Sequence, residues 1–277
     1  MNTSFKIDLH LHSNQSDGSS TPIEIIDQAA SKQMQVISIT DHDTFTVTQE
    51  LIDYAKSLNV ELIEGIEMSC MDETTGRKVH LLAYGFSNHH PHIDHLINTF
   101  KEHVTQKRLE IIDDLNALGF NITKEEVFTR FPLYKQDIAL AMEKKGYGDF
   151  ATLFSTYLRG SQSLEKKHPV SFTLVEKAIE AIHLDGGIAV LAHPRTYNTF
   201  DEIEKYISWG LDGIEISHPS YREDDLEKVI HYPLLHTGGS DYHGNLNIST
   251  KRQIGNYGIT SEQYKRLKEV INHDVHD

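Results

Sequence analysis

Residues 7–18 read IDLHLHSNQSDG, and up to His12 aliphatic and polar residues alternate. At the two-residue period of a β-strand, this alternation places the aliphatic side chains on one face and those of His10 and His12 on the other. Asp17 adds a carboxylate from the turn rich in serine and glycine that follows. Imidazole and carboxylate ligands suit zinc, manganese or iron. The segment therefore predicts a metal site, which residues elsewhere in the chain must complete.

Length and composition limit the class of protein. A chain of 277 residues can form one large domain, including an α/β barrel, or a domain with an insertion. The formal net charge of -15 disfavours a broad electrostatic surface for nucleic acid or membrane, so local cations or metal ions must hold an anionic substrate. The single cysteine, Cys70, excludes an internal disulfide. Because the start is polar and no long apolar run occurs, we expect a cytoplasmic protein without a membrane span.

Strands and helices alternate along most of the chain. Besides the first strand, apolar runs bounded by turn residues predict strands at residues 36–40, 61–67, 78–84, 188–192, 213–217 and 233–237. Helical periodicity predicts helices at residues 22–34, 47–58, 173–184, 201–209 and 261–272, with one more before residue 233. This succession is typical of an α/β fold with a mostly parallel sheet.

The middle of the chain has a different pattern. Residues 93–118 predict one long helix, a capping box at residue 123 opens another, and residues 135–145 and 149–158 predict two more. No strand signal interrupts this part. We therefore interpret residues 93–168 as an all-helical insertion that serves as a substrate cap, and residues 1–92 and 169–277 as the barrel domain.

The positions of the polar residues are more informative than their number, although the chain contains 18 histidines. Potential ligands lie just past the carboxyl end of most predicted strands, where barrel enzymes build their active sites. These residues are His10, His12, His42, Glu67, His193, His218, Asp241 and His243. His80 lies inside its predicted strand, from which an inward-facing side chain can still reach the mouth of a barrel.

The ordered series of motifs resembles the PHP family, the polymerase and histidinol phosphatase domain. The series comprises the His-x-His pair, Asp17, a Thr-Asp-His turn, the acidic strand end, Ala-His-Pro and Ser-Asp-x-His. The resemblance covers nearly the whole chain and is closest to the free-standing small phosphoesterases of that family. It implies a distorted seven-stranded (β/α)7 barrel, similar to a TIM barrel, with metal ions at the carboxyl ends of the strands.

The resemblance also implies two or three divalent metal ions and nine ligands for them. The first ion is held by His10, His12 and Asp241, and the second by His80 and His193, with Glu67 bridging the two. The third ion is held by Asp17, His42 and His243. Manganese, zinc and iron all accept imidazole and carboxylate ligands, so the ligand types do not select one metal.

The implied reaction is hydrolysis of a phosphate ester by metal-activated water, without a covalent protein nucleophile. Asp43 has three interpretations: a helix cap, a partner that orients a ligand histidine, or the proton donor to the leaving group. His218 has two, a substrate contact or a structural role.

Candidate phosphate-binding residues come mainly from the insertion and from the turn after the Ala-His-Pro motif. They are Arg130, Lys135, Arg159, Arg195 and His218. For Arg130 and Arg159, the alternative is a position on a solvated helix face. In similar small phosphoesterases, an Arg-Pro-His-Ile-Ala-like segment opens a helix of the insertion and helps to hold phosphate, whereas residues 135–139 here read KQDIA. Lysine lacks the bidentate fork of arginine, and we expect the charge of Asp137 to repel phosphate.

Four functions are compatible with these observations. The first is a phosphatase for a small phosphate monoester such as a nucleotide or nucleoside bisphosphate. The others are a histidinol-phosphate phosphatase, an exonuclease on short oligonucleotides, and a metal-binding domain without turnover. The expected partners are a small phosphorylated substrate or a short oligonucleotide, with no membrane and no obligate protein partner.

Overall fold

The computed structural model describes residues 5–159, 163–246 and 251–273. Contacts divide the chain into two units, Met1–Leu96 with Thr173–Asp277, and Ile97–Phe172. We call them the barrel unit and the helical unit. The helical unit covers nearly the same residues as the expected insertion.

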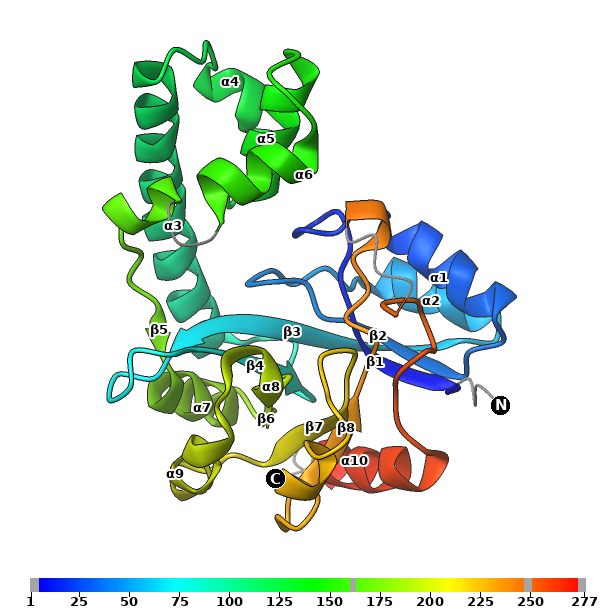
Figure 1. Cartoon of the computed structure of the whole chain (residues 1–277). Helices are drawn as coiled ribbons and strands as arrows, with labels where there is room; N and C mark the ends of the chain where they lie inside the picture. Colours follow the sequence, from blue (N-terminus) through cyan, green and yellow to red (C-terminus); the bar gives the residue numbers. More distant parts are fainter. Residues whose placement is uncertain (1–4, 160–162, 247–250, 274–277) are drawn as a thin grey trace. The chain divides into compact units, whose positions relative to one another are not determined.

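The barrel unit is built around one sheet with the strand order β1-β2-β3-β4-β6-β7-β8 (Figure 1). The strands are β1 (Ile7–Leu11), β2 (Val36–Ile39), β3 (Glu61–Met71), β4 (Lys78–Tyr84), β6 (Ile188–Leu191), β7 (Gly213–Ser217) and β8 (Leu235–Gly238). At the two ends of the sheet, Leu11 bridges Tyr242, and the amide of Asp241 donates to the carbonyl of His10 at 2.9 Å. The expected seven-stranded α/β barrel is therefore confirmed, as a nearly closed barrel.

Strand β4 departs from the parallel pattern. It runs antiparallel to β3 and β6, whereas the other neighbours along this path are parallel. The prediction that β3 ends at Glu67 is wrong, because β3 continues to Met71 and pairs with β4 across a tight turn. Buried apolar side chains at Met68 and Cys70 favour this longer strand. Since β4 is reversed, its first half, which includes His80, lies where the parallel strands end. A short strand, β5 (Thr173–Leu174), pairs with the last residues of β3.

Helices accompany the barrel strands. They are α1 (Pro22–Ser31), α2 (Gln49–Ser57), α7 (Val175–Leu184), α8 (Pro194–Tyr197), α9 (Ile203–Ser208) and α10 (Ser261–His273). Thr21 and Glu24 form the capping box that starts α1, with Glu24 N donating to Thr21 Oγ1 at 3.2 Å. The predicted helix before residue 233 is wrong, because that segment contains only a 3₁₀ turn at Leu226–Lys228.

The aliphatic residues of β1 pack as the alternation predicts. Leu11 lies in a buried cluster with Ile25 and Ile37, and Leu9 lies in another with Tyr84 and Leu267. The two histidines of the strand are nevertheless also fully buried. Burial of polar groups without partners is unfavourable, so their contacts have to compensate for the loss of water.

The helical unit has its own apolar core. The long helix α3 (Pro91–Ala117) starts in the barrel unit and continues into this one, followed by α4 (Lys124–Val127), α5 (Lys135–Lys144) and α6 (Phe150–Leu153). The predicted helix at residues 149–158 is only partly correct, because Phe154–Leu158 forms a π-helical turn. Leu115, Ile138 and Met142 are among the fully buried side chains of its core. Within the described ranges, neither α3 nor any other helix has the combination of length and apolarity that a membrane span requires.

Candidate metal centre

Four potential ligand atoms converge beyond the end of β1. His10 Nε2 lies 3.1 Å from both His12 Nε2 and Glu67 Oε2, and His12 Nε2 lies 3.0 Å from that oxygen. Asp241 Oδ1 is 3.3 Å from His12 Nε2 and 3.7 Å from His10 Nε2. All four side chains are buried. The structure thus brings the first implied ligand set together around one oxygen of Glu67.

The other oxygen of Glu67 faces a second pair of histidines. Glu67 Oε1 is 2.8 Å from His80 Nδ1 and 2.7 Å from His193 Nε2. His193 directly follows the buried residue after β6, and His80 reaches this position because β4 is reversed. One carboxylate therefore carries a histidine pair at each oxygen, as expected of a ligand shared by two cations.

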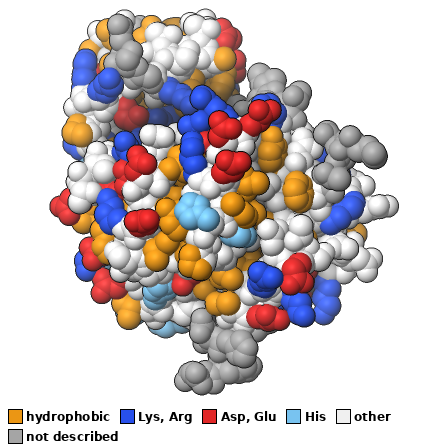
Figure 2. Space-filling view, turned by 60° about the horizontal axis from the view of Figure 1, so that its bottom comes forward, with side chains coloured by type: hydrophobic (Ala, Val, Ile, Leu, Met, Phe, Trp, Pro, Cys, Tyr) orange, Lys and Arg blue, Asp and Glu red, His pale blue; other side chains and the backbone are white. Residues whose placement is uncertain are grey.

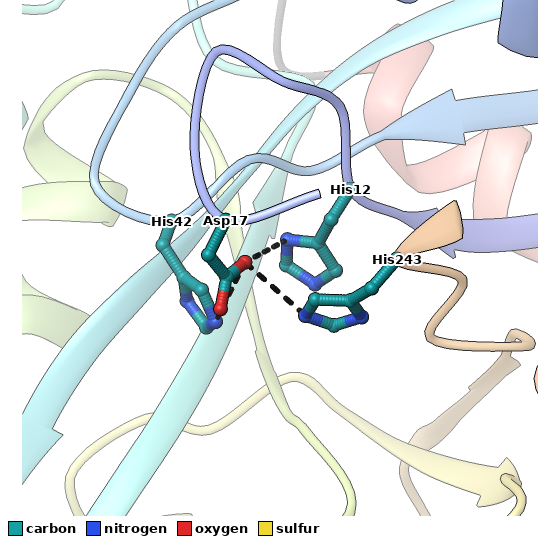
Figure 3. Close-up of side chains that lie close together, drawn as sticks. All are labelled: His12, Asp17, His42 and His243. Atoms are coloured by element: carbon teal, nitrogen blue, oxygen red, sulfur yellow. Dashed lines mark ion pairs between the residues drawn. The ribbon is translucent and has the colours of Figure 1, made fainter. Parts of the chain in front are cut away.

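A third group gathers around Asp17. Asp17 Oδ1 lies 3.2 Å from His243 Nε2, 3.9 Å from His42 Nε2 and 3.9 Å from His12 Nδ1 (Figure 3). His42 also approaches the shared glutamate, with Nδ1 3.3 Å from Glu67 Oε2. The group contains the third implied ligand set and, in addition, His12.

The donor atoms fit a divalent cation. An ion bound tetrahedrally at about 2.0–2.1 Å separates its ligand atoms by about 3.4 Å, close to the distances around Glu67. Three overlapping groups have ligand atoms within 4.8 Å of one another. Considering only the part of the chain that the structure describes, the buried nitrogens His12 Nδ1 and His193 Nδ1 lack a hydrogen-bond partner. Imidazole nitrogens and carboxylates in this arrangement suit zinc, manganese or iron.

The carboxylates of the centre are held in their charged form. Burial by itself raises the pKa of Glu67, but nearby histidines, His10 first among them, hold that pKa well below its usual value. Burial likewise raises the pKa of Asp17, and His243 and other histidines outweigh it, so that this pKa is also well below the ordinary value. Both side chains therefore present negative charge at neutral pH.

The histidines respond to burial in two ways. Burial lowers the pKa of His42 to about 4 and also lowers the pKa of His12, so both rings are neutral at pH 7. For His10, burial also acts to lower the pKa, but the carboxylates of Glu67 and Glu215 raise it to about 10. A cation that binds to His10 must therefore displace a proton, which makes its binding dependent on pH.

The backbone is strained at three of these positions. Non-glycine residues rarely adopt positive φ, yet φ is 27° at His193, 50° at Asp241 and 50° at Asp43. Such conformations cost about 1–3 kcal/mol each and persist where surrounding contacts enforce them. Among the described residues, Gln33, Asn59 and Asn198 also have positive φ, so such conformations are not confined to the turns that present potential ligands.

Asp43 does not cap a helix. The N-cap of α2 is Thr48, so this interpretation of Asp43 is wrong. Asp43 Oδ1 instead accepts a hydrogen bond from Ser69 N at 2.9 Å, which ties the turn after β2 to the neighbouring strand. The side chain is buried, and burial raises its pKa.

Two further candidates in the barrel unit have defined partners. His218 is buried, with Nε2 3.1 Å from Asp241 Oδ2 and Nδ1 2.7 Å from Ser220 Oγ. Arg195 Nε lies 2.8 Å from the buried carboxylate of Asp225. His218 is thus in direct contact with a potential ligand, and Arg195 is held by an ion pair.

The candidates in the helical unit are mostly paired as well. Arg130 holds Asp137 with two contacts, Nε to Oδ2 at 3.2 Å and NH2 to Oδ1 at 2.7 Å. Lys135 Nζ lies 3.0 Å from Glu165 Oε2, and Arg159 is exposed. Arg130 therefore pairs with the charge of Asp137 within the same unit, and the effect of Asp137 on phosphate binding stays a prediction.

Sequence reasoning assigned no role to several residues that contact the potential ligands or the segments that carry them. They are Asp8, Asp41, Tyr197, Glu215 and Arg252. Buried acidic residues within apolar strands were a usable signal for Asp8 and Glu215. Arg252 forms an ion pair with Asp241 from a loop without any recognisable motif. Tyr197 OH lies 3.0 Å from His80 Nε2, and its position after the Ala-His-Pro motif was the only hint.

A nearly closed α/β barrel with buried histidines and carboxylates around a shared glutamate defines a metal-dependent hydrolase. Comparison with known families narrows this class, because the PHP domain matches residues 8–215. The chain belongs to the PHP family. The match ends before Asp241 and His243, which the structure adds to the same centre.

Three curated relatives are similar over most of their length. The phosphoribosyl 1,2-cyclic phosphate 1,2-diphosphodiesterase of Eggerthella lenta is 32% identical, over 86% of this chain and 94% of the relative. The 5'-3' exoribonuclease of Haemophilus influenzae is 30% identical (86% and 90%), and the 3',5'-nucleoside bisphosphate phosphatase of Chromobacterium violaceum is 28% identical (86% and 87%). All three cleave phosphate esters. This chain is accordingly a metal-dependent phosphoesterase.

A solved structure supports the fold. A protein of Bifidobacterium adolescentis, with a proposed metal-dependent phosphoesterase function, superposes with a TM-score of 0.83 at 23% identity. The match covers 95% of this chain and 96% of that one. At this level of identity the likeness concerns the fold alone.

Proposed function

We propose that the protein hydrolyses a phosphate monoester of a small ribose compound, such as a nucleotide or a nucleoside bisphosphate. The observation that carries the proposal is the shared glutamate, because each oxygen of Glu67 faces its own pair of histidines. The nucleoside bisphosphate phosphatase among the relatives supports this choice of substrate.

The proposed cofactors are two or three divalent ions of manganese, zinc or iron, with the nine ligands that the motifs imply. Such ions supply an activated water and neutralise charge on the phosphate. The chain contributes the carboxylates of Glu67, Asp17 and Asp241, which compensate the charge of the ions. It also contributes histidines, which would hold the ions in place.

The helical unit is proposed to contact the phosphate of the substrate. Residues 97–172 contain 11 lysines and arginines and 10 acidic residues, so the barrel unit carries a formal charge of -16 out of the total of -15. An anionic substrate is therefore repelled less by the helical unit than by the barrel surface. Arg130, Lys135 and Arg159 are the proposed contacts there, and Arg195 is the proposed contact in the barrel unit.

A long nucleic acid is a poorer substrate on electrostatic grounds. Figure 2 shows positive and negative side chains interspersed on the face that it views, without a single continuous positive surface there. A short single strand needs only a local groove with cations and aromatic side chains. Short oligonucleotides are therefore among the substrates to be tested, although their cleavage is not the function that we propose.

A second candidate follows from the relative in Eggerthella lenta. That protein acts on a cyclic phosphodiester of a phosphoribosyl compound and is 32% identical to this chain over 247 aligned residues. A five-membered cyclic diester is as compact as a monoester, so the same kind of site can hold either. The candidate therefore predicts opening of a ribose cyclic phosphate in addition to release of inorganic phosphate.

The experiment combines elemental analysis of the purified protein with phosphate release from a panel of substrates. The panel contains nucleotides, 3',5'-bisphosphates, a ribose 1,2-cyclic phosphate, histidinol phosphate and short oligonucleotides. We expect bound divalent metal and fastest turnover of a small ribose phosphate. Protein that is loaded with manganese, zinc or iron and cleaves no member of the panel contradicts the proposal.

A further inference from the structure

Strand β7 supplies none of the nine proposed metal ligands, although its neighbours β6 and β8 lead directly into ligand-bearing turns. One polar residue of the strand and one directly after it are nevertheless buried against the centre. Glu215 lies within the strand and has no exposed surface, and His218 directly follows the strand and is also buried. A buried carboxylate and a buried imidazole each need a hydrogen-bonding partner to compensate for the loss of water.

The two oxygens of Glu215 contact two different ligand-bearing segments. Glu215 Oε1 lies 3.1 Å from His10 Nδ1, and Glu215 Oε2 accepts a hydrogen bond from the amide of His193 at 2.8 Å. His10 comes from β1, and His193 comes from the turn after β6. One side chain therefore connects the segment of His10, which faces one oxygen of Glu67, with the segment of His193, which faces the other.

The contact with His10 determines which ring nitrogen faces the centre. A proton on Nδ1 that is donated to Glu215 leaves Nε2 as the ligand atom, and Nε2 is the nitrogen that lies 3.1 Å from Glu67. The contact with His193 acts on the backbone, where φ is 27°. A charged acceptor for that amide helps to stabilise a conformation that the residue otherwise avoids.

His218 contacts a third ligand-bearing segment, the turn after β8 that carries Asp241. Its Nε2 lies 3.1 Å from Asp241 Oδ2, while Asp241 Oδ1 points to His10 and His12. The two oxygens of Asp241 thus have separate partners. Arg252 NH1 also forms an ion pair with Oδ2. His218 and Arg252 together hold the carboxylate with Oδ1 toward the centre.

We propose that β7 positions the ligands of the metal centre. Glu215 orients both His10 and His193, and His218, directly after the strand, orients Asp241. Neither residue touches the substrate in this role. The inference rests on the proposed metal binding. Its specific content is that affinity for the metal depends on two residues that are not ligands.

The test measures binding of manganese by calorimetry to chelator-treated protein, wild type against Glu215→Gln. The variant keeps the size of the side chain but removes its negative charge. We expect manganese affinity to fall by about 10- to 100-fold, the usual effect of removing such an outer partner. A purely structural role predicts a lower melting temperature of the metal-free protein with unchanged affinity.

Glu202→Gln is the matched control. Glu202 is also a buried glutamate of the barrel unit, but its partner is Arg77 and not a histidine of the centre. We expect this variant to lose stability while it binds manganese like the wild type. A similar loss of affinity in both variants overturns the inference, because it assigns the effect to general destabilisation.

Glu215→Asp is the second variant, in case Glu215→Gln does not fold. It retains the charge and withdraws the carboxylate from both partners, so a fall in manganese affinity is again expected. Wild-type affinity in either folded variant overturns the positioning role and leaves the proposed function intact. Failure of the wild-type protein to bind any divalent metal overturns both proposals.

Discussion

Replacement of Glu67 by glutamine is the sharpest test of the centre. The carboxylate faces five histidine nitrogens at distances between 2.7 and 3.3 Å. Glutamine has one oxygen and one NH₂ group, so one histidine pair must face a donor instead of an acceptor. When cations are bound, the neutral amide removes the charge-assisted contact of each carboxylate oxygen to its cation, each of about 1.5–3 kcal/mol. The sum of about 3–6 kcal/mol corresponds to a loss of about 10²- to 10⁴-fold in metal affinity.

The assay compares manganese affinity and turnover of p-nitrophenyl phosphate for wild type, Glu67→Gln and Glu64→Gln. Glu64 is the control because it lies on the same strand but outside the groups of potential ligands. We expect Glu67→Gln to keep its circular dichroism spectrum and to lose turnover, and Glu64→Gln to retain both. Wild-type turnover in folded Glu67→Gln would refute the argument that this carboxylate is shared by two cations.

Three other predictions concern residues around the centre. Arg195→Ala should raise KM more than it lowers kcat if Arg195 binds phosphate; an unchanged KM would assign it to the ion pair with Asp225. Asp43→Asn should slow substrates with poor leaving groups more than p-nitrophenyl phosphate if Asp43 donates the proton; equal effects would exclude that role. Burial raises the pKa of Asp72, but hydrogen bonds, that of Lys205 first, lower it to about 2. Ionised Asp72 therefore adds at most about 2.5 kcal/mol to the free energy of unfolding, in full above about pH 4, and this contribution is lost as pH falls toward 2. The free energies of unfolding of wild type and Asp72→Asn should converge as pH falls over that range, and a constant difference between them would contradict this.

Local periodicity was sufficient for much of the barrel. The alternation in β1 predicts which side chains pack with the apolar clusters and which leave from the opposite face, because the period of a strand is a property of its backbone. The capping box at Thr21 likewise identified the start of α1, since both of its hydrogen bonds lie within four residues. Such features depend on neighbours in the sequence and need no knowledge of the fold.

The direction of a strand was not available from its residues. The segment with His80 has the pattern of any buried strand, and only its pairing with β3 and β6 makes it antiparallel. That reversal explains why a histidine inside the strand joins ligands that follow other strands. The extension of β3 beyond Glu67 has the same origin, because the added residues are stabilised by pairing with β4.

The charges of the helical unit also depended on tertiary contacts. The sequence presents Asp137 as a negative residue in a segment that holds phosphate in similar proteins, and Arg130 as a cation seven positions earlier. In the structure the two side chains form a bidentate ion pair. Residues this far apart and on separate elements give no periodic signal that would reveal such a pair.

Local patterns indicate the family, the α/β class and the types of ligand, because strand ends and motif order are features of neighbouring residues. The sharing of the ligands follows from contacts that form in the folded barrel. Glu67 divides its oxygens between two histidine pairs, and Glu215 joins the segments of His10 and His193. The physical reason is that each of these contacts spans residues far apart in the chain, so its geometry exists only once the barrel closes.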